Sequence, residues 1–266
     1  MSRGTALKLR FKVPSAAAPL RRPLTSNVRP FTLAMDDARD HHDEHDDVPY
    51  EAWSELDFSI ITMGMKKLPF FEDDLYLGMQ AMNVGIVDSV VTEQEYALLR
   101  KWFEIERTPG ELATAVSALS QMWIYGLYEV LRMWRDRRFQ FEKLRQSGGI
   151  DLKLEGMSEV EPQNLTIEVR KRQLLRYKNE AAYRERIETT WSKLEPIYRM
   201  TELFRMNLAK HCAPGNDGVV PRAPGYGRIN RWCGAMDYEV VDKGGYYSIL
   251  NRRDIADGLR AILKMV

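Results

Sequence analysis

The chain has 266 residues, 44% of them hydrophobic and 29% charged, which is enough apolar material to bury a sizeable core. Its 39 Lys and Arg residues nearly balance 38 Asp and Glu residues, so the overall charge gives no argument for a dedicated nucleic-acid or membrane-surface protein, and any such binding must come from local charge. Two cysteines are too few for a disulfide scaffold or a Cys-rich zinc module and indicate a reducing, cytoplasmic location. No apolar run reaches about 18 residues, so we expect no membrane-spanning segment.

The first 47 residues differ in composition from the rest of the chain. Residues 1–35 carry seven Lys or Arg and no acid, whereas residues 36–47 carry seven acids and one Arg. We predict a disordered tail over 1–47, followed by a helical domain over 48–266. Residues 1–35 also have the Arg- and Ser-bearing composition of organelle transit peptides, and Met35 is an alternative start of the physiological chain.

Three of the four histidines, His41, His42 and His45, stand among the carboxylates of the acidic segment. Imidazoles interleaved with carboxylates can bind Zn²⁺ or another divalent cation. A folded metal site needs a fixed ligand geometry, and nothing in this segment imposes one. We therefore interpret the segment as a solvated linker and expect no cofactor, with a metal-handling role as the alternative.

The first part of the predicted domain, which is rich in acidic residues, is expected to form two helices, at about 68–83 and 92–106. In the second of these, Thr92 and Glu95 have the spacing of a capping pair. We therefore place a helix start at that point.

The clearest helix is predicted over 108–146. Thr108 and Glu111 form a capping-box pattern at its start, and two glycines follow its end. A second apolar face accompanies the main stripe, so the helix is expected in the centre of a bundle or in a dimer interface. The main stripe recurs at spacings of three and four residues: Leu112, Val116, Leu119, Trp123, Leu127, Leu131 and Trp134.

Residues 147–163 are interpreted as a loop, after which helical composition runs over 164–212. Pro196 interrupts this stretch and predicts two helices or one kinked helix. In its second part an apolar stripe again recurs at spacings of three and four, and Arg205 falls on it. The stripe contains Ile187, Trp191, Leu194, Tyr198, Thr201, Arg205, Leu208 and Cys212.

The last part of the chain changes from helical to strand-like periodicity. Residues 235–241 and 246–250, joined by the turn sequence DKGG, predict a short β-hairpin. Asn251 with Asp254 then caps a final helix that ends at the C-terminus. The predicted fold is thus mainly α, a helical bundle to which residues 213–266 append a small hairpin and a final helix.

Signatures of P-loop nucleotide binding, dinucleotide binding, zinc proteases and α/β-hydrolases are all missing from the sequence. The fourth histidine, His211, closes the long helical stretch in FRMNLAKHCAPGN. Asn207 lies four residues earlier on the same face, close enough to orient the imidazole, and Arg205 projects from the apolar stripe. A buried Arg needs an anionic partner, which is either Glu202 in a structural role or a bound phosphate.

The Arg-x5-His pattern from Arg205 to His211 resembles the signature of the HEPN superfamily, whose members are helical dimeric domains and in many cases metal-independent ribonucleases. In that family the pair stands at the end of the penultimate core helix. The likeness covers about residues 92–212. Met206 follows the arginine where the family tends to carry a polar residue, and Asn207 comes one position later.

This resemblance implies a homodimeric RNA endonuclease with a toxin or defence role and a possible antitoxin or other partner protein. His211 would act as general acid or base on the ribose 2′-hydroxyl or the leaving 5′-oxygen, with Asn207 orienting it. Arg205 would hold the phosphate. The substrate would be RNA because the mechanism consumes the 2′-hydroxyl. The interface would draw on the helix that bears Arg205 and on its packing neighbour.

Two alternatives stay open from the residues themselves. The basic stretches 132–145 and 164–178 are either a track for a nucleic-acid backbone or solvated helix faces. The protein as a whole is either the endonuclease or a non-catalytic helical dimerisation and interaction module. In the second case Arg205 pairs with Glu202, and His211 caps the helix C-terminus, where a cation is favoured.

Overall fold

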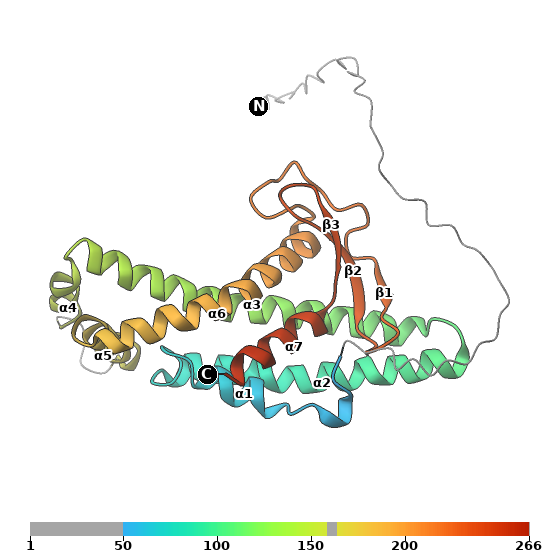
Figure 1. Ribbon diagram of the computed structural model, residues 1–266, viewed down its shortest axis with the longest axis horizontal. Helices are drawn as coiled ribbons and strands as arrows, with labels where there is room; N and C mark the ends of the chain where they lie inside the picture. The colour runs from blue at the N-terminus through green and yellow to red at the C-terminus, as the bar shows by residue number, and fades with distance from the viewer. Residues whose placement is uncertain (1–49, 159–163, 266) are drawn as a thin grey trace, which may run out of the picture. The chain divides into compact units, whose positions relative to one another are not determined.

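Two long helices, α2 (Leu75–Ile105) and α3 (Gly110–Gln146), run beside each other and form the base on which the other elements pack (Figure 1). The computed structural model describes residues 50–158 and 164–265. Within these residues the fold is mainly α, with seven α-helices and one small antiparallel sheet, which confirms the predicted fold class. The tail predicted over 1–47, with His41, His42 and His45, lies outside the described residues.

Helix α2 corrects the prediction of two separate helices at 68–83 and 92–106. It is continuous from its N-cap, Asp74, whose carboxylate accepts a hydrogen bond from the backbone N–H of Leu77. Thr92 and Glu95 are fully buried in mid-helix, and the Thr92 hydroxyl donates to the carbonyl of Asp88 one turn earlier. The capping spacing was misleading because both side chains have tertiary partners on another helix.

The predicted helix 108–146 is confirmed as α3, although it begins at Gly110. Its N-cap is Pro109, and no side chain caps it, so the expected Thr108–Glu111 capping box does not form. Two tryptophans of its stripe bury their rings and satisfy their indole N–H groups on neighbouring backbone. Trp123 donates to the carbonyl of Val84 and Trp134 to that of Pro69, at 2.9 and 2.6 Å.

The region expected as a loop over 147–163 contains a short helix, α4 (Ile150–Ser158). It is followed by α5 (Leu165–Asn179) and α6 (Ala181–Arg205). These are the two helices expected from composition. The break between α5 and α6 lies at Glu180, whose backbone is extended (φ −107°, ψ 105°), and not at Pro196.

Pro196 lies inside α6. Its ring is at an exposed position, as is Ser192 one turn earlier. Water can therefore hydrogen-bond the Ser192 carbonyl, which loses its helical donor to the proline. The solvent-facing side of the helix thus tolerates a residue that a buried side would not.

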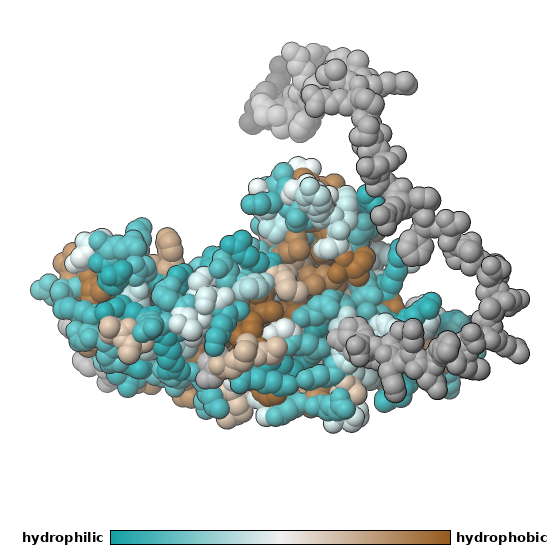
Figure 2. Space-filling model, viewed as in Figure 1, coloured by the Kyte–Doolittle hydropathy of each residue, from teal (hydrophilic) through white to brown (hydrophobic). Residues whose placement is uncertain are grey.

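The predicted hairpin is present as β2 (Met236–Val241) and β3 (Tyr247–Leu250), and β1 (Gly227–Ile229) adds a third strand in the order β1-β2-β3. Both pairings are antiparallel, with Tyr238 opposite Leu250. The sheet packs on the helices through Tyr238, whose hydroxyl lies 2.6 Å from that of Ser117 on α3. Figure 2 shows apolar surface gathered where α6 and α7 approach the sheet.

The final helix, α7 (Arg252–Leu263), begins with the predicted capping box. The side chain of Asn251 accepts from the Asp254 N–H, and the Asp254 carboxylate accepts from the Asn251 N–H. Helix α7 contacts α6 and the short α1 (Ser59–Lys66). Residues 213–266, expected as an appendage, therefore contribute to the same core as the helices.

A buried ionic cluster joins α7 to α2. Arg252 and Arg260 on α7 contact Asp88 and Glu95 on α2, and the four side chains are almost or completely inaccessible to water. The Nε of Arg252 donates to Glu95 at 2.7 Å, and its Nη2 donates to the Thr92 hydroxyl at 2.7 Å. Burial opposes the charge on Arg252, but Glu95 and Asp88 outweigh that effect and hold its pKa above the ordinary value. Two cations thus balance two carboxylates.

Removing one member of this cluster should be strongly destabilising. Arg252→Met leaves the buried Glu95 without its arginine partner and Asp88 with Arg260 alone, and we expect the free energy of unfolding to fall by roughly 3–5 kcal/mol. Urea unfolding followed by circular dichroism measures this loss. The control is Arg199→Met, which removes an exposed ion pair with Glu195 and should leave stability unchanged. A loss below about 1 kcal/mol for Arg252→Met would contradict the role assigned to the cluster.

Candidate functional site

The segment that carries Arg205, Asn207 and His211 lies where α6 ends against the sheet. Beyond Arg205 the helix widens into a π-helical turn, Met206–Lys210. His211 follows in the left-handed conformation (φ 55°), and its N–H bonds to the Met206 carbonyl. Its side chain is exposed to solvent. The imidazole is therefore accessible from solvent at the helix end.

Asn207 is fully buried and links the π turn to strand β2. Its amide nitrogen donates to the carbonyls of Leu203 and Val241, and its amide oxygen accepts from the Val241 N–H at 2.8 Å. Asn207 was expected to orient the His211 imidazole. The structure shows no contact between them, because the hydrogen bonds of the Asn207 amide go to the backbone of Leu203 and Val241. Asn207 instead sets the position of the segment from which Arg205 and His211 project.

Arg205 is half-buried, and its guanidinium lies over the ring of Tyr128 on α3, 4.5 Å from the ring centroid. Its Nη1 is 3.8 Å from the sulfur of Met206. Among the described residues no carboxylate lies within ion-pair distance of it. Glu202, the acid offered as its structural partner, instead accepts a hydrogen bond from Tyr198 at 3.1 Å.

A second arginine and tyrosine complete an arginine–tyrosine cluster made of Arg135, Arg205, Tyr128 and Tyr198. The two tyrosine rings are stacked with centroids 5.7 Å apart. Arg135 lies over Tyr198, 4.7 Å from its centroid, and donates to its hydroxyl. Burial raises the pKa of Tyr198 well above its ordinary value, with further contributions from Tyr128 and Glu202, so the phenol stays neutral.

The sequence predicts a second apolar face on this helix, to which Tyr128 belongs, and sequence reasoning missed this cluster. Tyr128 and Arg135 are seven residues apart, which places them two turns apart on one side of α3. That spacing was the available signal. The partners Tyr198 and Arg205 have the same spacing on α6, so the two helices present matching pairs.

Most arginines of the basic stretch 132–145 are neutralised within the protein. Arg137 pairs with the buried Asp74, Arg138 with Glu188 and Arg145 with Glu142. The hydrogen bond from Arg145, aided by those from Tyr177 and Gln146, lowers the pKa of Glu142 to about 2. These pairings favour the helix-face interpretation of the stretch over a continuous track for a nucleic-acid backbone.

Within residues 50–158 and 164–265, which the structure describes, no group of three or more His, Cys, Asp or Glu side chains could hold a metal ion. None of the helices in these residues has both the length and the apolar character needed to cross a membrane.

Comparison of the chain with protein-family models, with curated proteins and with solved structures finds no significant match.

Loss of Asn207 should affect folding rather than proton transfer. Asn207→Ala leaves the buried N–H and carbonyl of Val241 without their partner and removes one of the two donors to the Leu203 carbonyl, and we expect the free energy of unfolding to fall by roughly 2–4 kcal/mol. His211→Ala, at an exposed position four residues later, should change stability little. Urea unfolding of both variants measures the difference, and equal stability of the two would contradict the structural role of Asn207.

Proposed function

We propose that the protein is a metal-independent RNA endonuclease of the HEPN type that acts as a homodimer. The observation that carries the proposal is the state of Arg205, which is half-buried on Tyr128 and has no carboxylate partner in the described chain. A desolvated guanidinium without a protein anion is a favourable site for a phosphate, which it can bind through two parallel hydrogen bonds. The rival pairing with Glu202 is absent, since that carboxylate serves Tyr198.

In this proposal the π turn brings both reactive groups to one end of α6. Arg205 binds the scissile phosphate and stabilises the negative charge that develops on it. His211 removes the proton from the ribose 2′-hydroxyl or protonates the leaving 5′-oxygen, for which its exposed position is suitable. The 2′-oxygen attacks phosphorus as the 5′-oxygen leaves, so the products carry a 2′,3′-cyclic phosphate and a 5′-hydroxyl.

An exposed apolar face on α2 and α3 supports the homodimer. Its side chains are 36–60% exposed: Met79, Ile86, Val87, Val90, Leu119 and Met122. Between the two helices lies a groove of about 410 Å³ whose lining includes Gly126, where a second helix could approach closely.

The same apolar face is the observation that favours a second candidate, a non-catalytic dimerisation and interaction module. Both candidates share the dimer, and they differ in whether RNA is cleaved. If the endonuclease is a cytoplasmic toxin or defence protein, an antitoxin or other partner protein could cover this face or the Arg205 site.

A cleavage assay separates the two candidates. With EDTA present, the wild type should cleave a fluorogenic single-stranded RNA and release 2′,3′-cyclic phosphate ends. His211→Ala should lower the rate by roughly 10²-fold or more, and Arg205→Ala should do the same. The matched control is Arg199→Ala, which removes another arginine of α6 and should leave the rate unchanged. Cleavage that needs added metal, or that His211→Ala leaves intact, would refute the mechanism.

The dimer has its own test. Light scattering at micromolar concentration should give about twice the monomer mass of 30.9 kDa. Met122→Asp places a charge on the exposed apolar face and should shift the mass toward the monomer, while thermal unfolding still shows a folded protein. Leu152→Asp, on α4, is the control for an exposed apolar residue elsewhere. A monomeric wild type would argue against both candidates.

A further inference from the structure

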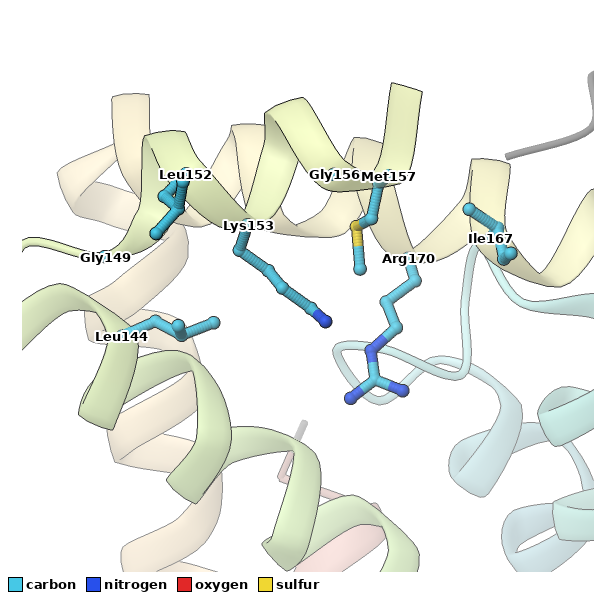
Figure 3. Close-up of a pocket in the computed structure, with 8 residues that line it drawn as sticks. All are labelled: Leu144, Gly149, Leu152, Lys153, Gly156, Met157, Ile167 and Arg170. Atoms are coloured by element: carbon cyan, nitrogen blue, oxygen red, sulfur yellow. The ribbon is translucent and has the colours of Figure 1, made fainter. Parts of the chain in front are cut away.

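A hollow of about 620 Å³ lies between the end of α3, helix α4 and helix α5, on elements that do not carry Arg205 or His211 (Figure 3). Two cationic side chains point into it from different helices, Lys153 from α4 and Arg170 from α5. The other walls are apolar or glycine: Leu144, Gly149, Leu152, Gly156, Met157 and Ile167. The hollow therefore combines an apolar lining with positive charge.

No acid among the described residues lines this hollow. An adjoining hollow of about 320 Å³ shares Lys153 and Arg170 and adds Lys143, again with no Asp or Glu in its described lining. Arg170 donates to the amide oxygen of Gln140, an uncharged group. Neither Lys153 nor Arg170 has a carboxylate of the described chain within ion-pair distance.

This lack of partners distinguishes the two cations from their neighbours. Lys178 on α5 pairs with Asp151, and Arg176 pairs with Glu72, Asp73 and Glu180. Burial, together with the charge of Arg137, lowers the pKa of Arg170 below its ordinary value. The guanidinium is thus held in an environment that disfavours its charge, and an anion bound in the hollow would relieve that cost.

We propose that this hollow binds a small amphiphilic anion, an organic phosphate or carboxylate with a short apolar body. The anionic group would lie between Lys153 and Arg170, with Lys143 adding to the positive potential. The apolar body would pack on Leu144, Met157 and Ile167. The volume and the mixture of apolar walls with a few polar groups match the usual character of small-molecule sites. This site is independent of the proposed RNA cleavage.

Calorimetric titration with octyl phosphate, inorganic phosphate and octanol tests the proposal on the full chain. Octyl phosphate should bind more tightly than either of the other two probes, because only it supplies both the anion and the apolar body. Lys153→Gln and Arg170→Gln should each weaken its binding by roughly tenfold or more. The matched control is Arg172→Gln, an exposed arginine of α5 outside the hollow, which should leave the affinity unchanged. Octanoate in place of octyl phosphate separates a carboxylate preference from a phosphate preference.

Three outcomes would overturn the proposal. The first is no binding of octyl phosphate or octanoate at millimolar concentration. The second is equal binding of octanol, which would show an apolar site without charge recognition. The third is equal weakening by all three variants, which would indicate attraction to overall charge. Loss of RNA cleavage has no bearing on these outcomes, and thermal unfolding of each variant checks that it is folded.

Discussion

The mutual neutralisation of Arg252 and Arg260 by Asp88 and Glu95 is the constraint on which the rest of this structure depends. Arg252 and Asp88 are 164 residues apart in the chain and are both inaccessible to water. A charge in such a place is tolerated only with its partners present, so α7 cannot leave α2 without leaving carboxylates unpaired in the core. The cluster thereby joins the end of the chain to the longest helical pair.

The sheet connects α7, and so the buried ionic cluster, to the segment that carries Arg205 and His211. Strand β3 leads directly into the capping box of α7, and β2 pairs with β3. At the end of β2, Val241 exchanges hydrogen bonds with Asn207 in the π turn of α6. The position of Arg205 and His211 therefore depends on contacts made by parts of the chain on either side of them. A buried amide that satisfies three backbone groups is well suited to this, because its geometry is directional.

The arginines of this protein differ in whether they are paired with an acid or held by an uncharged group. The arginines of α3, like Arg176 on α5, are matched with nearby acids, so their positive charge is not available to a ligand. Arg205 is held by a tyrosine ring, an interaction of about 0.5–2 kcal/mol that leaves its hydrogen-bond donors open. Arg170 donates a hydrogen bond to the side-chain amide of Gln140. The two proposed anion sites follow from that difference, and a tally of basic residues would not have found them.

The sequence by itself determined the features that depend on neighbouring residues. The stripe on 108–146, the hairpin near 235–250 and the Asn251–Asp254 capping box are local patterns. The hairpin and the capping box are present, and the stripe is buried except at Leu112, which is partly exposed, and Leu119, which is exposed. Tertiary structure alone decided which partner each polar side chain takes. Thr92 and Glu95 have the spacing of a cap yet bind Arg252, and Arg205 is one turn from Glu202 yet lies over Tyr128 of α3. A short-range spacing shows only which groups can meet, whereas burial makes one partner obligatory once distant helices have packed.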